Sequence, residues 1–115
     1  MTVAELTELL GAKVLNAGVD LSRQVESAYV CDLLSWVMAK GAPGTAWVTV
    51  MNHMNVIAVA TLLDMACVII PENIEVKPET LDKAAEEEIP VLSTGKTAFE
   101  IAGLMHEKGL GDPVK

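Results

Sequence analysis

The chain has 115 residues, a length that suits one domain with a single core. Its formal net charge is −8, and the acidic side chains concentrate in residues 72–88, so nucleic-acid backbones and anionic membranes are unfavourable partners. Half of the residues are hydrophobic but only four are aromatic, which predicts a core of aliphatic and methionine side chains. No apolar run reaches the roughly 18 residues of a membrane helix, and no signal-peptide pattern is visible. We therefore expect a cytoplasmic protein, with Cys31 and Cys67 as free thiols.

The first third of the chain predicts two helices and two strands. Thr2 and Glu5 form the pattern of a capping box, which begins a helix over residues 3–10. Strands are expected at residues 12–15 and 24–31. Asp32 is then the expected N-cap of a short helix, which the glycines and proline of residues 40–44 end.

The stretch from Thr45 to Asn55 is the centre of the predicted fold. Residues 45–51 are apolar and partly β-branched, as in a strand covered on both faces. From Asn52 the apolar residues follow a 3.6-residue period, so we expect Asn52 to cap a helix that ends near residue 63. Residues 67–70 predict another buried strand.

The remaining elements follow the same alternation. Pro78 opens an acidic helix over residues 77–88. Residues 89–92 form the last strand, Thr94 or Thr97 caps a helix to about residue 107, and the tail 109–115 is expected to fray. This order predicts a single domain over residues 1–115, a three-layer α/β/α fold with a largely parallel sheet of about five strands.

The most suggestive motif is Ser93-Thr94-Gly95-Lys96-Thr97, because it follows a strand and opens a helix. A phosphate-binding P-loop needs a glycine at position 90, where this chain has Pro90. The segment therefore cannot form the loop that wraps the phosphates of a nucleoside triphosphate. Two interpretations stay open: a weak anion site at a helix N-terminus, or simple capping by hydroxyl side chains.

Two further polar segments also follow strands. His53 and Asn55 belong to the first turn of the central helix, and Glu72 lies in the turn after residue 70. Because carboxyl ends of parallel strands share an edge, these segments should gather there. The candidate ligand-binding residues are Asn52, His53, Asn55, Glu72, Ser93, Thr94 and Thr97. No catalytic residue and no metal ligand is assigned, because no nucleophile has a matching base and no set of metal-ligating residues assembles.

Three segments resemble the DRTGG domain family, which is related in fold to the N-terminal domain of bacterial HPr kinase/phosphorylase. They are residues 29–38, residues 53–60, and residues 89–94 with 97–100. The resemblance spans nearly the whole chain and is closest to small free-standing members, some of them encoded near iron hydrogenases. It implies a three-layer α/β/α domain with a regulatory or accessory role and no chemistry of its own. It also implies a homodimer, because relatives that carry CBS modules are dimeric.

The chain departs from the pattern that names this family. Asn52-His53 stands where other members have Asp-Arg, and Pro71-Glu72-Asn73 stands where others have Thr-Gly-Gly. A position that is often glycine is Cys31 here. The kinase chemistry of HPr kinase resides in another domain, which this chain lacks.

The leading hypothesis is therefore a non-catalytic regulatory or accessory domain, a homodimer that senses a small anionic metabolite or nucleotide at the carboxyl ends of the strands. Residues 33–38, with Trp36, are the expected apolar contact of that dimer. No cofactor is assigned, and a nucleotide is left open. The alternative is a protein-interaction subunit of a redox, hydrogenase-associated system, with the acidic helix as its docking face.

Overall fold

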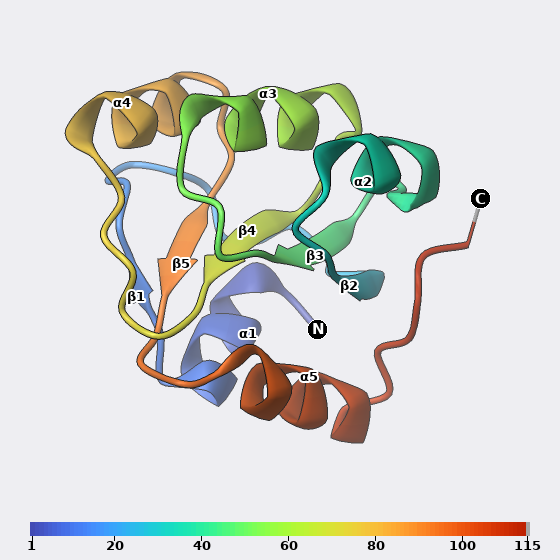
Figure 1. Cartoon of the computed structure of the whole chain (residues 1–115). Coiled ribbons are helices and arrows are strands. Elements are labelled where there is room, and N and C mark those ends of the chain that lie inside the picture. Colours follow the sequence, from blue (N-terminus) through green and yellow to red (C-terminus); the bar gives the residue numbers. More distant parts are fainter. Residues whose placement is uncertain (115) are drawn as a thin grey trace.

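The computed structural model describes residues 1–114 and has five helices and five strands in the predicted order (Figure 1). The helices are α1 (Val3–Leu10), α2 (Leu34–Lys40), α3 (Met54–Leu62), α4 (Pro78–Glu86) and α5 (Ala98–Glu107). The strands are β1 (Lys13–Val14), β2 (Ser27–Val30), β3 (Thr45–Val48), β4 (Cys67–Ile70) and β5 (Val91–Ser93). The alternation of helices and strands predicted from the sequence is confirmed.

One sheet runs through the molecule in the order β1-β5-β4-β3-β2. The pairs β2–β3, β3–β4 and β4–β5 are parallel, whereas β1 joins β5 in antiparallel register, with Lys13 opposite Ser93. The prediction of a largely parallel sheet is confirmed. Because the four parallel strands run the same way, their carboxyl ends meet at one edge of the domain.

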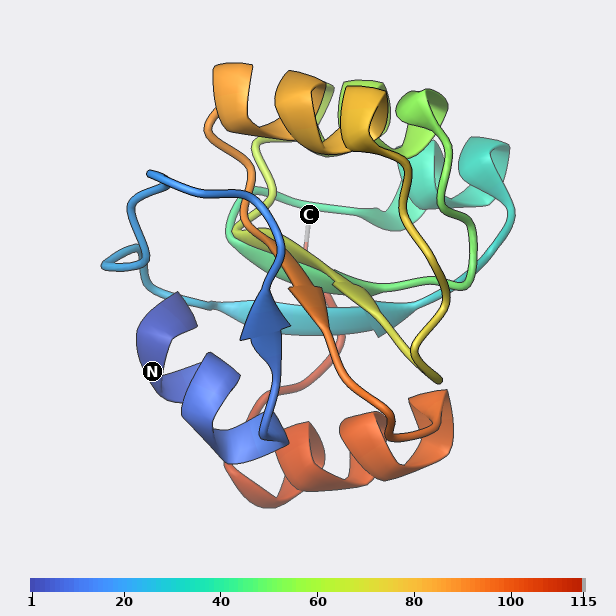
Figure 2. The same cartoon turned by 90° about the vertical axis from the view of Figure 1, so that its left-hand side faces the viewer.

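Helices cover both faces of this sheet, which gives the predicted three layers. Figures 1 and 2 show α2, α3 and α4 above the sheet and α1 with α5 below it. Side chains of β4 alternate between the two cores, as the two-residue period of a strand requires. Cys67 and Ile69 belong to the core between the sheet and helices α1 and α5, which we call the core under α1 and α5. Val68 and Ile70 belong to the core between the sheet and helices α3 and α4, which we call the core under α3 and α4.

Two helices begin with complete capping boxes. The Thr2 hydroxyl accepts a hydrogen bond from the Glu5 backbone N–H, and the Glu5 carboxylate accepts one from the backbone N–H of Thr2. Thr97 and Glu100 repeat this arrangement at the start of α5. The predicted cap of α1 is confirmed, and of the two threonines proposed for α5 the cap is Thr97.

The predicted N-cap at Asp32 is wrong. Helix α2 begins after Leu33, which caps it without a side-chain hydrogen bond. The Asp32 carboxylate oxygen Oδ1 instead accepts from the Thr49 hydroxyl at 2.8 Å and from the Val50 N–H at 2.9 Å. Asp32 therefore ties the segment that leaves β2 to the segment that leaves β3.

The predicted N-cap at Asn52 is also wrong, because the helix starts one residue later. His53 occupies the N-cap position of α3 and makes no capping hydrogen bond with its side chain. The Asn52 side chain donates from Nδ2 to the backbone carbonyl of Glu75 at 2.6 Å. A partner 23 residues away has thus replaced the local capping bond that the sequence pattern suggested.

Element ends differ elsewhere by a few residues. Strand β2 covers Ser27–Val30 within the predicted segment 24–31, and Gln24 makes an isolated bridge with Thr2 outside the strand. Strand β3 ends at Val48 where residues 45–51 were expected, and β5 covers Val91–Ser93 where residues 89–92 were expected. Helix α4 ends at Glu86, before the predicted residue 88.

The expected fraying of residues 109–115 is wrong for the first part of the tail. Leu110 packs against the core under α1 and α5, and the backbone carbonyl of Gly111 accepts a hydrogen bond from the Ala28 N–H at 2.8 Å. The tail therefore lies along the outer edge of β2. Lys115 lies outside the described residues.

Cys31 is half-buried, Cys67 is buried, and both are free thiols. Burial raises the pKa of the Cys67 thiol to about 12, so it stays protonated at neutral pH and behaves as a small core residue. Within residues 1–114, none of the helices combines the length and the apolar character that crossing a bilayer requires.

Candidate functional site

The loops that follow β3, β4 and β5 are joined to one another by hydrogen bonds. The N–H of Glu72 donates to the carbonyl of Lys96 at 3.0 Å, and the N–H of Asn73 donates to the carbonyl of Thr94 at 3.0 Å. The bond from Asn52 to Glu75 connects the loop after β3 to the same group. These three loops, residues 49–53, 71–77 and 94–97, form one continuous edge, which we call the rim.

The turn after β4 contains two residues in the left-handed backbone region. Glu72 and Asn73 have φ angles of +56° and +54°, in the left-handed region that costs a residue with a side chain roughly 1 kcal/mol or more. Gly95 approaches this turn so closely that a Cβ there would lie 2.9 Å from Nδ2 of Asn73. Strain of this kind is retained where the surrounding structure over-determines it, often at functional sites.

Two of the predicted ligand-binding residues have structural roles. Thr94 is buried, and its hydroxyl donates to the carbonyl of Leu10 at 3.2 Å and accepts from the Lys96 N–H at 3.2 Å. The Thr97 hydroxyl is the cap of α5. Of the two interpretations of this segment, capping therefore accounts for Thr97, and Thr94 bonds α1 to the rim.

Lys96, the cation of the same segment, lies on the α1 side of the sheet. Its Nζ is 3.6 Å from the point where a Cβ on Gly11 would lie, at the C-terminal end of α1. A cation is favourable at that end of a helix dipole. The segment of residues 93–97 thus directs its charge away from α3 and α4.

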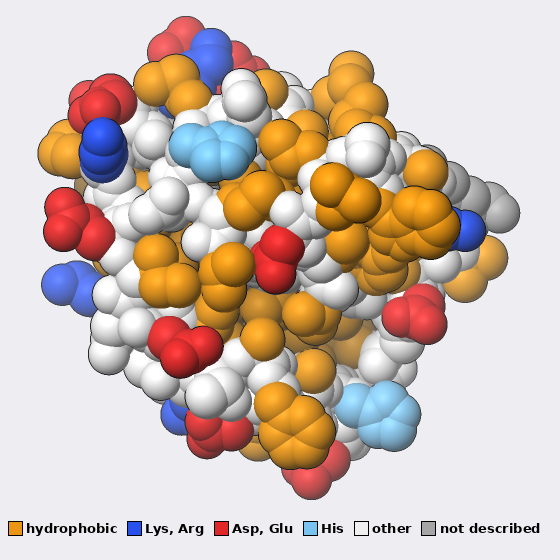
Figure 3. Space-filling model, in the orientation of Figure 1, with side chains coloured by type: hydrophobic (Ala, Val, Ile, Leu, Met, Phe, Trp, Pro, Cys, Tyr) orange, Lys and Arg blue, Asp and Glu red, His pale blue; other side chains and the backbone are white. Residues whose placement is uncertain are grey.

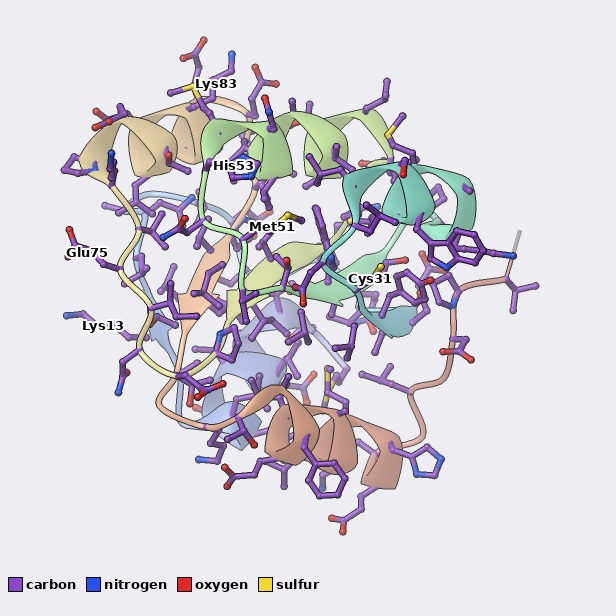
Figure 4. All side chains as sticks on the ribbon, viewed as in Figure 1. Lys13, Cys31, Met51, His53, Glu75 and Lys83 are labelled. Carbon is purple, nitrogen blue, oxygen red and sulfur yellow. The ribbon has the colours of Figure 1, made fainter. Side chains whose placement is uncertain are left out.

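The other predicted residues differ in how available they are. The Asn52 amide nitrogen is bonded to Glu75, whereas His53 and Asn55 are exposed and make no side-chain hydrogen bond within residues 1–114. Glu72 is exposed in its turn, and Ser93 is half-buried at the end of β5. Figure 4 shows His53 at the start of α3, on the side that faces α4.

A hollow of about 260 Å³ lies beside His53, where α3 and α4 begin. Its walls are formed by Asn52, His53, Met54, Lys77, Glu79 and Thr80. The last three residues were missed from the sequence, because they belong to the start of a helix that looked like an acidic solvated surface. Lys77 could have been identified from the sequence because it directly precedes Pro78. A proline at the first helical position marks the residue before it as the N-cap.

A second, larger hollow of about 610 Å³ lies between β2 and α5. Tyr29, Val30 and Phe99 contribute apolar walls, and His106 and Asp112 are its polar members. None of the predicted ligand-binding residues lines this hollow. It is therefore separate from the rim hollow at α3 and α4.

Apolar side chains share the rim side of the molecule with these polar groups. In the space-filling view of Figure 3, hydrophobic side chains gather over α2 and the neighbouring strand ends, with the acidic side chains scattered around them. Six large side chains from this region are between 37% and 61% exposed: Val30, Leu33, Trp36, Met38, Val50 and Met54. We call these six residues the α2 surface. Across residues 1–114, no three His, Cys, Asp or Glu side chains gather as a metal site would require.

Comparison with known proteins adds two findings. The family model described as the DRTGG domain matches residues 5–108. One similar solved structure is described as the CBS and DRTGG domains of the regulatory region of Clostridium perfringens pyrophosphatase, complexed with the activator diadenosine tetraphosphate. The TM-score is 0.71 at 14% identity over 98% of this chain and 48% of that one, so this chain spans about half its length. At such an identity the likeness shows the fold alone. No curated protein matches this chain.

Proposed function

This chain belongs to the DRTGG domain family, and on that basis we propose that it is a non-catalytic regulatory domain that binds a small anionic metabolite or a nucleotide at the rim. The observation that supports the proposal is the set of hydrogen bonds that joins the three loops into one edge at the carboxyl ends of parallel strands. Open α/β sheets bind ligands at this edge.

The polar groups of the rim and of the first turn of α3 favour binding over bond-breaking. His53 and Asn55 offer hydrogen-bond donors and acceptors, and Glu72 offers a carboxylate that suits a ribose or an amine. The solved regulatory region that shares this fold was crystallised with a nucleotide activator, which supports a nucleotide as the ligand class. The alternative role, as a protein-interaction subunit of a redox system, gains no support from either comparison.

We expect His53→Ala to weaken ligand binding about fivefold, because the variant removes one hydrogen-bonding group worth about 1 kcal/mol at the rim. The measurement is isothermal titration calorimetry with a panel of adenine nucleotides, diadenosine tetraphosphate and sugar phosphates. His106→Ala is the matched control, because His106 is the other histidine and lies on α5, away from the three loops. The sensing proposal fails if no member of the panel binds saturably, or if both variants bind every ligand as the wild type does.

We also propose that the domain forms a homodimer through the α2 surface. A solvent-exposed tryptophan, with 52% of its surface accessible, and Leu33, with 61%, form its centre. Apolar and aromatic side chains are enriched in the cores of such interfaces. A twofold contact here would place α2 against α2 and keep the acidic helix α4 of each copy outside the interface. Each chain has a net charge of −8, and this arrangement keeps the electrostatic repulsion between the two copies low.

Trp36→Asp is expected to convert the dimer to a monomer, because the change introduces a charge at the centre of the apolar contact. Light scattering coupled to size-exclusion chromatography at about 50 µM should give twice the chain mass of 12.2 kDa for the wild type and 12.2 kDa for the variant. Phe99→Asp serves as the control, since Phe99 is 88% exposed but belongs to α5. A monomeric wild type, or dissociation by Phe99→Asp alone, would contradict the proposed contact.

A further inference from the structure

The hollow beside His53 lies where two helices start side by side. Both α3 and α4 have nine residues, and they pack against each other on the same face of the sheet. Figure 2 shows their first turns at the same side of the molecule. The hollow is lined by the N-cap residue of each helix, His53 and Lys77, so both N-terminal ends meet in it.

Neither of these helix ends is capped by a side chain. The backbone N–H groups of Met54 and Asn55 in α3, and of Glu79 in α4, have no hydrogen-bond partner within residues 1–114. Each such group carries part of the positive end of a helix dipole. The same chain caps α1 and α5 with complete threonine–glutamate boxes, and α2 is the one other described helix that begins without a side-chain cap. Among the described residues, this hollow is therefore the place where two uncapped helix starts meet.

Thr80 gives an independent indication of a ligand. Its side chain lines the hollow, and the residue is only 4% exposed. Within residues 1–114 its hydroxyl has no hydrogen-bond partner, whereas Thr7 and Thr61, which also lie in helices, donate to the carbonyl four residues earlier. Within the described residues no fully buried side-chain oxygen or nitrogen lacks a partner, so the unpaired Thr80 oxygen keeps contact with solvent, and the hollow is the opening that it lines. The hydroxyl therefore has hydrogen-bonding capacity that a group entering the hollow can use.

The charges around the hollow indicate which group that is. Lys77 stands at the N-cap of α4, where a cation is unfavourable beside the positive end of the dipole. An anion held between the two helix ends would reverse this cost, since it would interact favourably with both dipoles and with the ammonium. Glu79 also lines the hollow and is exposed, so its carboxylate can turn to solvent or accept from a hydroxyl of the ligand.

We propose that this hollow is the seat of a phosphoryl group, held by the backbone N–H groups of Met54, Asn55 and Glu79, the Thr80 hydroxyl and the Lys77 ammonium. Helix N-termini bind phosphate through this combination of free N–H groups and dipole. The inference rests on the proposed sensing function and specifies its ligand as a phosphate ester. A volume of about 260 Å³ accommodates a phosphoryl group but not a complete nucleotide, so the remainder of the ligand lies outside the hollow.

The test is an amide NMR titration of the full chain with inorganic phosphate, followed by one with adenosine diphosphate. Phosphate is expected to shift the amide signals of Met54, Asn55, Glu79 and Thr80 in a saturable manner. Thr80→Val, which keeps the shape and removes the hydroxyl, should raise the dissociation constant about fivefold, as expected for the loss of one hydrogen bond. Lys77→Gln should raise it about tenfold or more, as expected for the loss of a charge-assisted contact.

The matched control is Lys83→Gln, because Lys83 belongs to the same helix but pairs with Glu86 and Glu87 near its other end. This variant has the same net charge as Lys77→Gln and should bind phosphate like the wild type. The inference is overturned if phosphate shifts none of the four amides, or if Lys83→Gln weakens binding as much as Lys77→Gln. If nucleotide binding shifts only the amide signals of residues 72–73 and 94–96, the proposed phosphoryl site is wrong but the sensing function is still supported. Phosphate binding here without nucleotide or sugar-phosphate binding would support the seat and refute the sensing function.

Discussion

Trp47→Ala is expected to lower the free energy of unfolding by about 4 kcal/mol, the larger of the two stability effects that the structure predicts. Trp47 is fully buried in the central strand β3 and belongs to the core under α3 and α4. Its indole Nε1 also donates to the backbone carbonyl of Cys31 at 2.9 Å, which fixes the end of β2. Alanine would leave a cavity and an unpaired carbonyl together.

Urea unfolding followed by far-ultraviolet circular dichroism measures this loss without relying on tryptophan fluorescence. Trp47→Phe is the matched comparison, because phenylalanine fills most of the volume but lacks the N–H donor. It should cost about half as much as alanine. A Trp47→Ala loss below about 1 kcal/mol would mean that the core on this face relaxes around the missing ring and that Trp47 does not organise it.

Asn16→Ala is expected to cost about 3 kcal/mol, because two buried backbone groups would lose their partners. Asn16 is 3% exposed and follows β1. Its Nδ2 donates to the carbonyl of Ile89 at 2.7 Å, and its Oδ1 accepts from the N–H of Val91 at 2.9 Å. This single side chain therefore bonds the segment after β1 to the start of β5.

The measurement is again urea unfolding, with amide hydrogen exchange at Val91 as a local readout. Protection of that amide should fall more than protection in β3. Asn55→Ala is the control, since Asn55 is exposed on α3 and has no side-chain hydrogen bond within residues 1–114. It should change stability by less than about 0.5 kcal/mol. Equal losses in the two variants would show that the Asn16 bridge contributes nothing specific.

Local sequence signals predicted much of this fold. The order of helices and strands, the capping box that begins α1, and the four-residue strand β4 all depend on residues within a few positions of one another. Periodicity and capping act over this short range, so a single chain displays them directly. The rim also followed from local information, because parallel strands joined by helices place their following loops at one edge.

Two local patterns failed where a distant partner was available. Asn52 and Asp32 both have the chemistry of an N-cap, yet Asn52 bonds to Glu75 and Asp32 bonds to Thr49 and Val50. A capping bond and a long-range bond compete for the same side chain. The hydrophobic periodicity of the sequence does not indicate whether the capping bond or the long-range bond forms in the folded chain.

The sequence alone determined the secondary structure, the three-layer fold and the three loops that could meet a ligand. Only the tertiary structure decided which polar side chains in those loops are already bonded, as Thr94 and Thr97 are, and which are open, as His53 and Thr80 are. The physical reason is that a hydrogen bond is satisfied by whatever group lies about 3 Å away in space. The chain brings Lys77 and Thr80 beside His53 only when α3 and α4 pack together.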